Sequence, residues 1–257
     1  MECGRAPGKR TAMNLNAWTQ EHSPRLGTLL SVDNPAVVEV ARLAGFDWLW
    51  IDAEHGQFNE AGAAVACGLC AGGPPAFVRL PDFSPTVIKR YLDTGCDGII
   101  LPGVSRLADV NQIARAALYP PRGERSVGIA RAQGYGATFQ EYLEKQGYSI
   151  LVQIETAEGV RNAREIVGHE AVDAVLIGPY DLSGSLGIPG QVDAPPVADA
   201  IASVRGICRE AGKPCGIFAA TAEMARAYAV HEFDLIAVGI DTTVLLNAFT
   251  QIRQILP

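Results

Sequence analysis

The chain has 257 residues, of which 48% are hydrophobic and 19% are charged, and its formal net charge is -7. This is the composition of an ordered globular protein, long enough for one large α/β barrel or two small domains. The negative charge argues against a nucleic-acid partner, which would require clustered lysines and arginines. No apolar run approaches the roughly 18 residues needed to cross a membrane.

The first 20 residues are predicted to form a partly disordered extension, and residues 21–257 a single domain. The extension is basic but lacks the apolar centre of a secretory signal, and Met13 is a candidate for the natural start. Six scattered cysteines favour packing roles in a reducing cytoplasm. Only Cys67 and Cys70 have the spacing of a metal or redox motif, and nothing nearby completes a zinc site.

Eight short apolar runs are predicted to be strands. They lack strict alternation of polar and apolar residues, as expected for strands that are buried on both faces of a parallel sheet. The runs are 26–31, 47–52, 76–80, 98–102, 150–155, 173–178, 214–218 and 234–240.

The segments between these runs carry helix boundary signals. A capping side chain, a proline at the first helical position and a glycine after the last turn mark two helices in full. These signals are Asp33 or Asn34 with Pro35 and Gly45, and Ser84 with Pro85 and Gly95; the further predicted caps are Asn59, Ser105, Thr156 and Thr221.

Eight strands that alternate with helices in a chain of this length predict a single (β/α)₈ TIM barrel. A doubly wound open sheet is the alternative. It favours a glycine-rich fingerprint after the first strand, and "LLSVDNPAVVE" contains no glycine. The longest interruption, residues 103–149, holds a helix and then a segment rich in Gly, Arg and Tyr, which predicts a loop over the active site.

Polar side chains follow four of the predicted strands. The active site of a TIM barrel lies at the carboxyl ends of its strands, so these residues are expected on one rim. They are Asp52 at the end of the second strand and His55 just after it, Arg79 at the end of the third, Gln153 and Glu155 at the end of the fifth, and Asp181 just past the sixth.

Glu155 and Asp181 are a candidate metal pair. Adjacent parallel strands lie about 4.8 Å apart, so two carboxylates at their ends are able to share one divalent cation. Oxygen ligands with several open positions suit Mg²⁺, Mn²⁺ or another transition ion such as Co²⁺. An ordinary pair of helix N-terminal carboxylates has the same spacing and remains the alternative.

His55 is the candidate for proton transfer, because the other three histidines lie in the N-terminal segment or near helix ends. A neighbouring carboxylate, Asp52 or Asp93, would raise its basicity. A hydrogen-bonding loop histidine is the alternative.

Arg79 emerges from a buried strand. A guanidinium that stays charged and donates two bonds suits an enolate or carboxylate, and an ion pair with Glu54 or Asp52 is the structural alternative. None of the four lysines ends a predicted strand, which disfavours Schiff-base chemistry.

The motifs "DWLWIDAEHG", "VRL", "YPPRGERSVG", "LVQIETAEG", "VLIGPYDLSGSLG" and "VGID" follow one another along the chain. Together they resemble the metal-dependent pyruvate aldolases of the HpcH/HpaI family, over roughly residues 25 to 250. That family has a (β/α)₈ barrel fold, in agreement with the strand count.

The resemblance implies a set of catalytic roles. His55 would be the acid/base, and Asp93 in "YLDTG" the carboxylate that makes this histidine more basic. Arg79 would stabilise the transition state, and Asp52 would belong to the same site.

The resemblance also implies how substrate and metal are held. Glu155 and Asp181 would be the metal ligands, and Gln153 with the backbone amides of Tyr180 and Asp181 would bind pyruvate. Relatives often have alanine at the position of Tyr180, so its phenol would narrow or reorient the acceptor pocket. Leu29 and Phe218 are also expected to shape that pocket.

The sequence therefore predicts a divalent-metal-dependent aldolase. It would reversibly cleave a 4-hydroxy-2-oxo acid into an aldehyde and pyruvate, or a close 2-oxo acid such as hydroxypyruvate, through an enolate. The alternatives are an oxaloacetate decarboxylase, a CoA-ester lyase of the same superfamily, for which no basic nucleotide groove is visible, and a non-catalytic barrel that binds a 2-oxo acid.

The last predicted helix has an apolar stripe, which in a monomer would cover its own strand. The resemblance instead implies a cytoplasmic hexamer in which this helix is exchanged between subunits. The stripe consists of Val244, Leu245, Ala248, Phe249, Ile252, Ile255 and Leu256.

Overall fold

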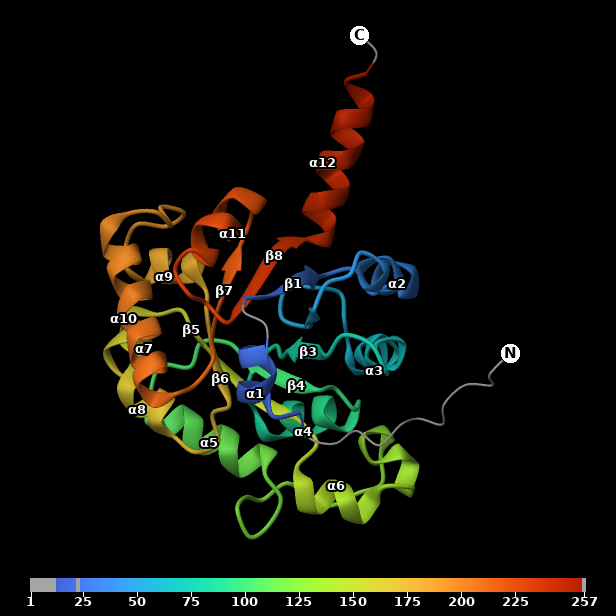
Figure 1. Cartoon of the computed structure of the whole chain (residues 1–257). Helices are drawn as coiled ribbons and strands as arrows, with labels where there is room; N and C mark the ends of the chain where they lie inside the picture. Colours follow the sequence, from blue (N-terminus) through green and yellow to red (C-terminus); the bar gives the residue numbers. More distant parts are fainter. Residues whose placement is uncertain (1–12, 22–23, 256–257) are drawn as a thin grey trace.

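The structure is a computed structural model that describes residues 13–21 and 24–255. Eight parallel strands follow one another in sequence order and close into a barrel, which confirms the predicted TIM-barrel fold (Figure 1). Every predicted strand is present, with each end within one residue of its prediction. The strands are β1 (Arg25–Leu30), β2 (Trp48–Asp52), β3 (Ala76–Arg79), β4 (Gly98–Leu101), β5 (Ser149–Ile154), β6 (Ala174–Ile177), β7 (Cys215–Ala219) and β8 (Leu235–Ile240).

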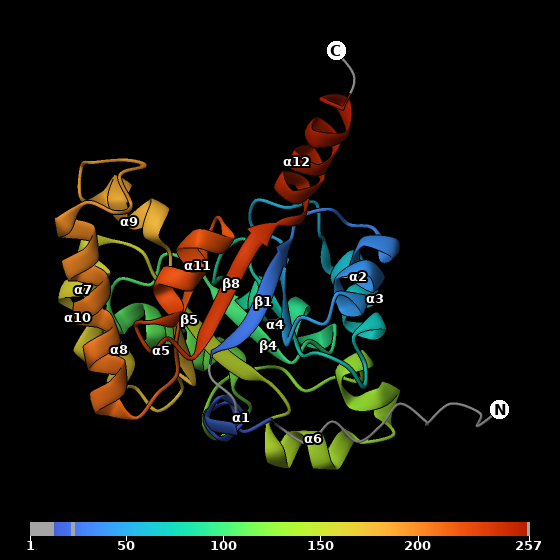
Figure 2. The ribbon, with the colours of Figure 1, turned by 45° about the horizontal axis from the view of Figure 1, so that its top comes forward.

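Helices surround the barrel, as the two views in Figures 1 and 2 show. They are α1 (Leu15–Glu21), α2 (Pro35–Leu43), α3 (Glu60–Leu69), α4 (Pro85–Asp93), α5 (Leu107–Ala117), the 3₁₀ segment η1 (Arg131–Gly136), α6 (Phe139–Lys145), α7 (Ala157–Arg161), α8 (Ala163–Gly168), α9 (Pro179–Ser185), α10 (Pro195–Ala211), α11 (Ala222–Ala229) and α12 (Asp241–Arg253).

Most predicted helix caps are confirmed. The side chains of Asn34, Asn59, Thr156 and Thr221 each accept a hydrogen bond from a backbone N–H in the first turn of α2, α3, α7 and α11. Ser84 occupies the cap position of α4 without a side-chain bond. The prediction of Ser105 is wrong by one residue: α5 begins after Arg106, because the Asp109 carboxylate accepts from both Ser105 N and Arg106 N.

Alternate strand residues separate two hydrophobic cores. Trp48 and Trp50 of β2 belong to a cluster inside the barrel, whereas Leu49 and Ile51 belong to the larger core between strands and helices. This alternation follows from the period of two residues in an extended strand. It predicts that the next inward position, Asp52, points into the carboxyl mouth of the barrel.

Helix α1 lies within the segment that the sequence assigns to an extension. Leu15 of α1 is 3% exposed and packs with the cluster inside the barrel. Residues 15–20 are therefore part of the folded barrel, because an apolar residue on this helix covers the interior cluster. Residues 1–12 of the predicted extension lie outside the described residues.

The segment predicted to cover the active site lies at the opposite end of the barrel. Arg131 donates at 2.9 Å to the carbonyl of Thr94, the residue that follows α4 and precedes β4. The segment therefore does not cover the active site of its own chain, and the prediction is wrong in this respect. The reason is that the segment connects a helix to the next strand, and such a connection returns to the amino ends of the strands.

Helix α12 projects away from the barrel (Figures 1 and 2). Only its first residue, Asp241, is buried, so this helix does not cover its own strand. No helix among the described residues is long and apolar enough to cross a membrane. The large apolar residues exposed on and just after α12 are Val244, Leu245, Leu246, Phe249, Ile252 and Ile255.

Candidate active site

The inward positions at the carboxyl ends of β2, β3 and β5 are polar. Each strand has a residue of the interior cluster two positions before its polar residue: Trp50 precedes Asp52, Phe77 precedes Arg79, and Leu151 precedes Gln153. Glu155 lies two positions after Gln153 and therefore continues the inward-facing positions of β5. All four polar side chains are buried, with exposed fractions of 2%, 8%, 2% and 7%. Buried polar groups require partners, so their contacts define the site.

Arg79 forms a dense ion-pair cluster with two carboxylates. Its Nε and Nη2 donate to the two oxygens of Asp52 at 2.9 and 2.8 Å, and Nη1 lies 3.1 Å from Glu54 Oε2. Burial opposes the charged guanidinium, but the hydrogen bond and charge of Asp52 outweigh it and raise the pKa of Arg79. The structure thus contains both ion pairs that the sequence left open. Two of the five guanidinium N–H groups remain for a substrate oxygen.

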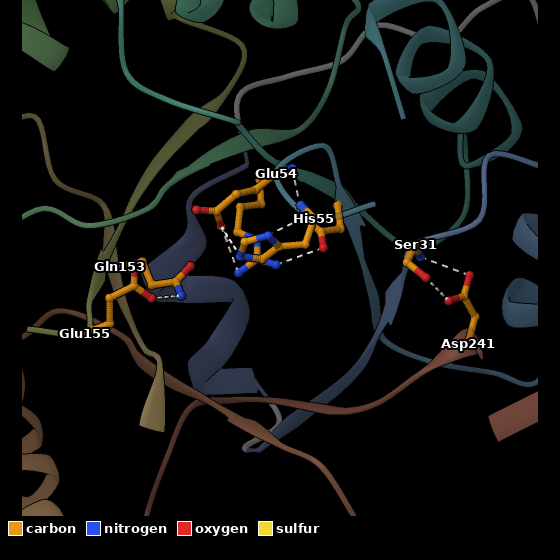
Figure 3. Close-up of polar contacts among 8 residues, drawn as sticks. Ser31, Glu54, His55, Gln153, Glu155 and Asp241 are labelled. Carbon is orange, nitrogen blue, oxygen red and sulfur yellow. Dashed lines mark hydrogen bonds and ion pairs between the residues drawn. The ribbon is translucent and has the colours of Figure 1, made fainter. Parts of the chain in front are cut away.

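His55 lies on the loop after β2, with 72% of its side chain exposed. Its Nε2 is 3.8 Å from Glu54 Oε2, and Figure 3 shows the two side chains next to each other. Asp52 contacts the loop differently: its Oδ1 accepts from the backbone N–H groups of Glu54 and His55 at 3.1 and 3.3 Å. Asp52 therefore holds the backbone of the loop, and the carboxylate beside the imidazole is Glu54.

Glu54 is the residue of this cluster that the sequence did not assign to the site. Burial raises its pKa, while the charges of Arg79 and then His55 oppose that change. Its position directly beside His55 in "DAEH" was the available signal, but neighbouring residues in a loop have no fixed relative direction. Only the geometry places it between guanidinium and imidazole.

Asp93 is not brought to His55 within one chain. It is the last residue of α4, whose carboxyl end precedes β4, so it lies at the amino end of the barrel. There Arg125 Nη2 donates to its Oδ1 at 2.6 Å. The guanidinium of Arg125 lies over the rings of Tyr119, Tyr142 and Tyr148.

Glu155 occupies the other side of the site (Figure 3). Its Oε1 accepts from Gly103 N at 2.7 Å, and Gln153 Nε2 donates to its Oε2. Gly178 permits this arrangement, because a Cβ atom there would lie 2.6 Å from Glu155 Oε2. Burial first, and then the negative charge of Asp181, raise the pKa of Glu155 to about 7 against the opposing hydrogen bond from Gly103.

The donor set fits a hard divalent cation. Glu155 and Asp181 are close enough for one charge to act on the other, and Gln153 Oε1 is buried with no hydrogen-bond partner among the described residues. A cation would relieve the repulsion of the carboxylates and the desolvation of Glu155. Across residues 13–21 and 24–255, no group of three or more His, Cys, Asp or Glu side chains forms a metal cluster, so water or substrate would complete the shell.

Tyr180 and Asp181 are the second and third residues of α9. Backbone N–H groups in the first turn of a helix have no acceptor within the helix and favour anions. The ring of Tyr180, which is 43% exposed, lies 6.4 Å from that of Phe218 at the end of β7. Leu29 is 4% exposed and belongs to the interior cluster, so it forms part of the floor beneath the mouth.

The three lysines among the described residues lie away from this site. Lys89 is within α4, Lys145 ends α6, and Lys213 precedes β7 at the amino end, where it donates to the carbonyl of His169.

Cys67 and Cys70 are both buried in the core around α3.

A closed (β/α)₈ barrel with buried carboxylates, a guanidinium and an imidazole at the carboxyl ends of its strands has the architecture of the barrel enzymes. Comparison with known proteins identifies the family. The model of the HpcH/HpaI aldolase/citrate lyase family matches residues 25–248. The chain belongs to this family, and it is a lyase of the class II pyruvate aldolase type, which sets aside a non-catalytic barrel.

Individual relatives agree with this assignment. A 4-hydroxy-2-oxovalerate aldolase of Rhodococcus jostii is 36% identical over 236 residues, covering 88% of each chain. A hydroxypyruvate/pyruvate aldolase of Deinococcus radiodurans is 39% identical over 230 residues, covering 88% of this chain and 83% of the relative. The crystal structure of a family member from Burkholderia cenocepacia superposes with a TM-score of 0.87 at 32% identity, covering 93% of this chain and 98% of that one.

Proposed function

We propose that the protein is a divalent-metal-dependent aldolase that reversibly cleaves a 4-hydroxy-2-oxo acid into an aldehyde and pyruvate, or a close 2-oxo acid such as hydroxypyruvate. The observation that carries this proposal is the buried carboxylate of Glu155 beside Asp181 and the unpartnered oxygen of Gln153. The site also holds Arg79, whose charge acts on Glu155. The relatives described above are named aldolases, which favours aldol chemistry over decarboxylation or cleavage of a CoA ester.

The binding half of the site would hold the 2-oxo acid. A divalent cation at Glu155 and Asp181 would act as a Lewis acid toward the 2-oxo group. The first-turn amides of Tyr180 and Asp181 donate to the substrate carboxylate, and Gln153 fixes its orientation. These groups come from the end of β5 and the start of α9, the helix that follows β6, and β5 and β6 are paired in the barrel.

The reacting half would move the charge and the proton. His55, directly or through water, takes the proton of the C4 hydroxyl as the bond between C3 and C4 breaks and the aldehyde forms. The bonding electrons pass to the 2-oxo group as an enolate, which the two remaining N–H groups of Arg79 stabilise. Protonation at C3 then gives pyruvate.

The proposal includes a homo-oligomer, with a hexamer as the expected form and α12 exchanged between subunits. The exposed apolar side of α12 supports it, because this helix has no cover within its own chain. An oligomer would also reconcile the location of Asp93 with the role that the resemblance implies for it. Since Asp93 and His55 lie at opposite ends of one barrel, Asp93 would increase the basicity of the His55 of a neighbouring subunit.

The test is a coupled assay for pyruvate release from 4-hydroxy-2-oxo acids, together with the reverse reaction of pyruvate with a panel of aldehydes. We expect turnover with Mg²⁺, Mn²⁺ or Co²⁺ that a chelator abolishes and added metal restores. The His55→Ala variant is the matched control for acid/base catalysis. Full activity after exhaustive chelation, or inactivation by borohydride in the presence of pyruvate, would contradict the proposal.

A further inference from the structure

Asp241, the first residue of α12, joins that helix to the loop after β1. Its Oδ2 accepts from the backbone N–H groups of Ser31 and Val32 at 3.0 and 2.9 Å, and its Oδ1 accepts from Ser31 Oγ at 2.6 Å (Figure 3). Oδ1 also accepts from the N–H of Thr242 at 2.8 Å. Asp241 is 8% exposed, so this carboxylate is a buried connection between two chain segments.

Ser31 in turn holds the loop that carries His55. Its carbonyl accepts from Gln57 N at 2.8 Å. The same loop closes tightly at Gly56, where a Cβ atom would lie 2.2 Å from the carbonyl oxygen of Asp52 and 3.0 Å from that of Ser31. The His55 loop is thus fixed at its start by the Asp52 carboxylate and at its end by the Ser31 carbonyl.

We propose that Asp241 is a positioning residue for the His55 loop, acting through Ser31 and Gln57. It does not reach the substrate site, but it fixes the backbone to which the end of the loop is bonded. The root of α12 and the acid/base loop are therefore one connected unit. The catalytic consequence rests on the proposed function of His55, whereas the positional link stands on the hydrogen bonds alone.

The chain offers graded variants. Asp241→Ala removes all four acceptor contacts. Asp241→Asn keeps an oxygen for the N–H groups of Ser31 and Val32, and its amide is able to donate to Ser31 Oγ. It loses only the bond from the N–H of Thr242, which lies within α12. Ser31→Ala removes only the hydroxyl contact and leaves the backbone bonds in place, so it is the matched control.

The test combines hydrogen–deuterium exchange of the full-length protein with steady-state kinetics. In Asp241→Ala, amide exchange in a peptide covering residues 53–58 should become at least about threefold faster, because the closed loop opens more often. The turnover number kcat should fall by roughly tenfold or more, since small misplacements of a catalytic group are costly. The KM should change less than about twofold, because the groups of β5 and α9 are untouched. In Asp241→Asn and Ser31→Ala, amide exchange of residues 53–58, kcat and KM should remain close to the wild-type values, because both variants retain acceptors for the backbone N–H groups of Ser31 and Val32.

The native mass of each variant is measured alongside, because Asp241 also starts α12. If Asp241→Ala does not fold, Asp241→Ser replaces it: it retains a hydroxyl at the start of α12 but is too short to hold both amides, and the same changes are expected. Unchanged exchange in residues 53–58 would overturn the inference, even if activity falls with assembly. Faster exchange with unchanged kcat would support the positional link and refute the role of His55 in the proposed function.

Discussion

The buried carboxylate of Glu155 leads to a prediction about metal binding and pH. Its pKa is about 7, against an ordinary value of 4.5, so the metal-free protein holds a proton there across the mildly acidic range. A cation must displace that proton, because a carboxylate binds metal in its ionised form. We therefore expect metal binding to release a proton and to strengthen as the pH rises toward 7.

The size of the effect follows from the pKa. For one displaced proton with a pKa of about 7, the dissociation constant for Mn²⁺ should fall about fiftyfold between pH 5 and pH 7 and little further above pH 8. The same group affects folding. Because its pKa is raised in the folded state, it contributes stability below its unfolded pKa of 4.5 that is lost as the pH rises through about 7. That loss is on the order of 3 kcal/mol in the metal-free protein, and saturating metal should offset it.

The assay is titration calorimetry of Mn²⁺ binding at several pH values, in buffers of different ionisation enthalpy so that released protons are counted. Glu155→Gln should bind Mn²⁺ weakly and without this pH dependence. Asp181→Asn should also bind weakly but move the pH midpoint down, because the charge of Asp181 contributes to the raised pKa of Glu155. A dissociation constant that is constant from pH 5 to pH 8, or a midpoint near 4.5, would refute the reasoning.

Three further predictions concern the other groups of the site. Arg79→Lys should lose about 2–4 kcal/mol of transition-state stabilisation, because lysine keeps the charge but not the planar two-point donation to the enolate. Turnover above about a third of wild type would show that the role of Arg79 is misassigned. Tyr180→Ala should broaden the range of aldehydes accepted in the synthesis reaction while the KM for pyruvate stays within about twofold, since in the proposed site only the backbone of Tyr180 would contact the 2-oxo acid. An unchanged aldehyde profile would argue against a role for the phenol. Truncation after Thr243 should give a smaller species by light scattering with little activity, and a full-length monomer with normal activity would contradict the oligomer.

The sequence was sufficient for the barrel because strands buried on both faces leave a strong local signal. Helix caps such as Asn34 and Asn59 are also local, since the side chain bonds to a backbone N–H only two or three residues away. The rim residues Asp52, Arg79 and Glu155 were predictable for a related reason. Every second side chain of a strand points into the barrel, and this alternation continues to the carboxyl end of the strand.

The remaining features depend on which end of the barrel a segment reaches. The glycine- and arginine-rich segment before β5 has the composition of an active-site loop, but its position after a helix takes it to the amino end, where Arg131 contacts Thr94. Asp93 lies at the same end for the same reason. Glu54 was missed because loop geometry, not spacing, directs it toward Arg79. The bonds from Asp241 to Ser31 join residues 210 positions apart, so no local pattern contains them.

Contacts between subunits, as proposed above, would account for both the exposed side of α12 and the location of Asp93. A helix of 13 residues is marginally stable alone, and α12 receives little packing from its own barrel. Covering Phe249 and Ile252, each 64% exposed, would contribute about 1.5–3 kcal/mol per side chain at full burial. A second chain is the natural source of that cover, and it would also bring a carboxylate to a histidine that its own Asp93 cannot reach. Because Asp241 fixes the direction of α12 and holds the loop of His55 through Ser31, docking of this helix would act on the same backbone that positions the catalytic imidazole.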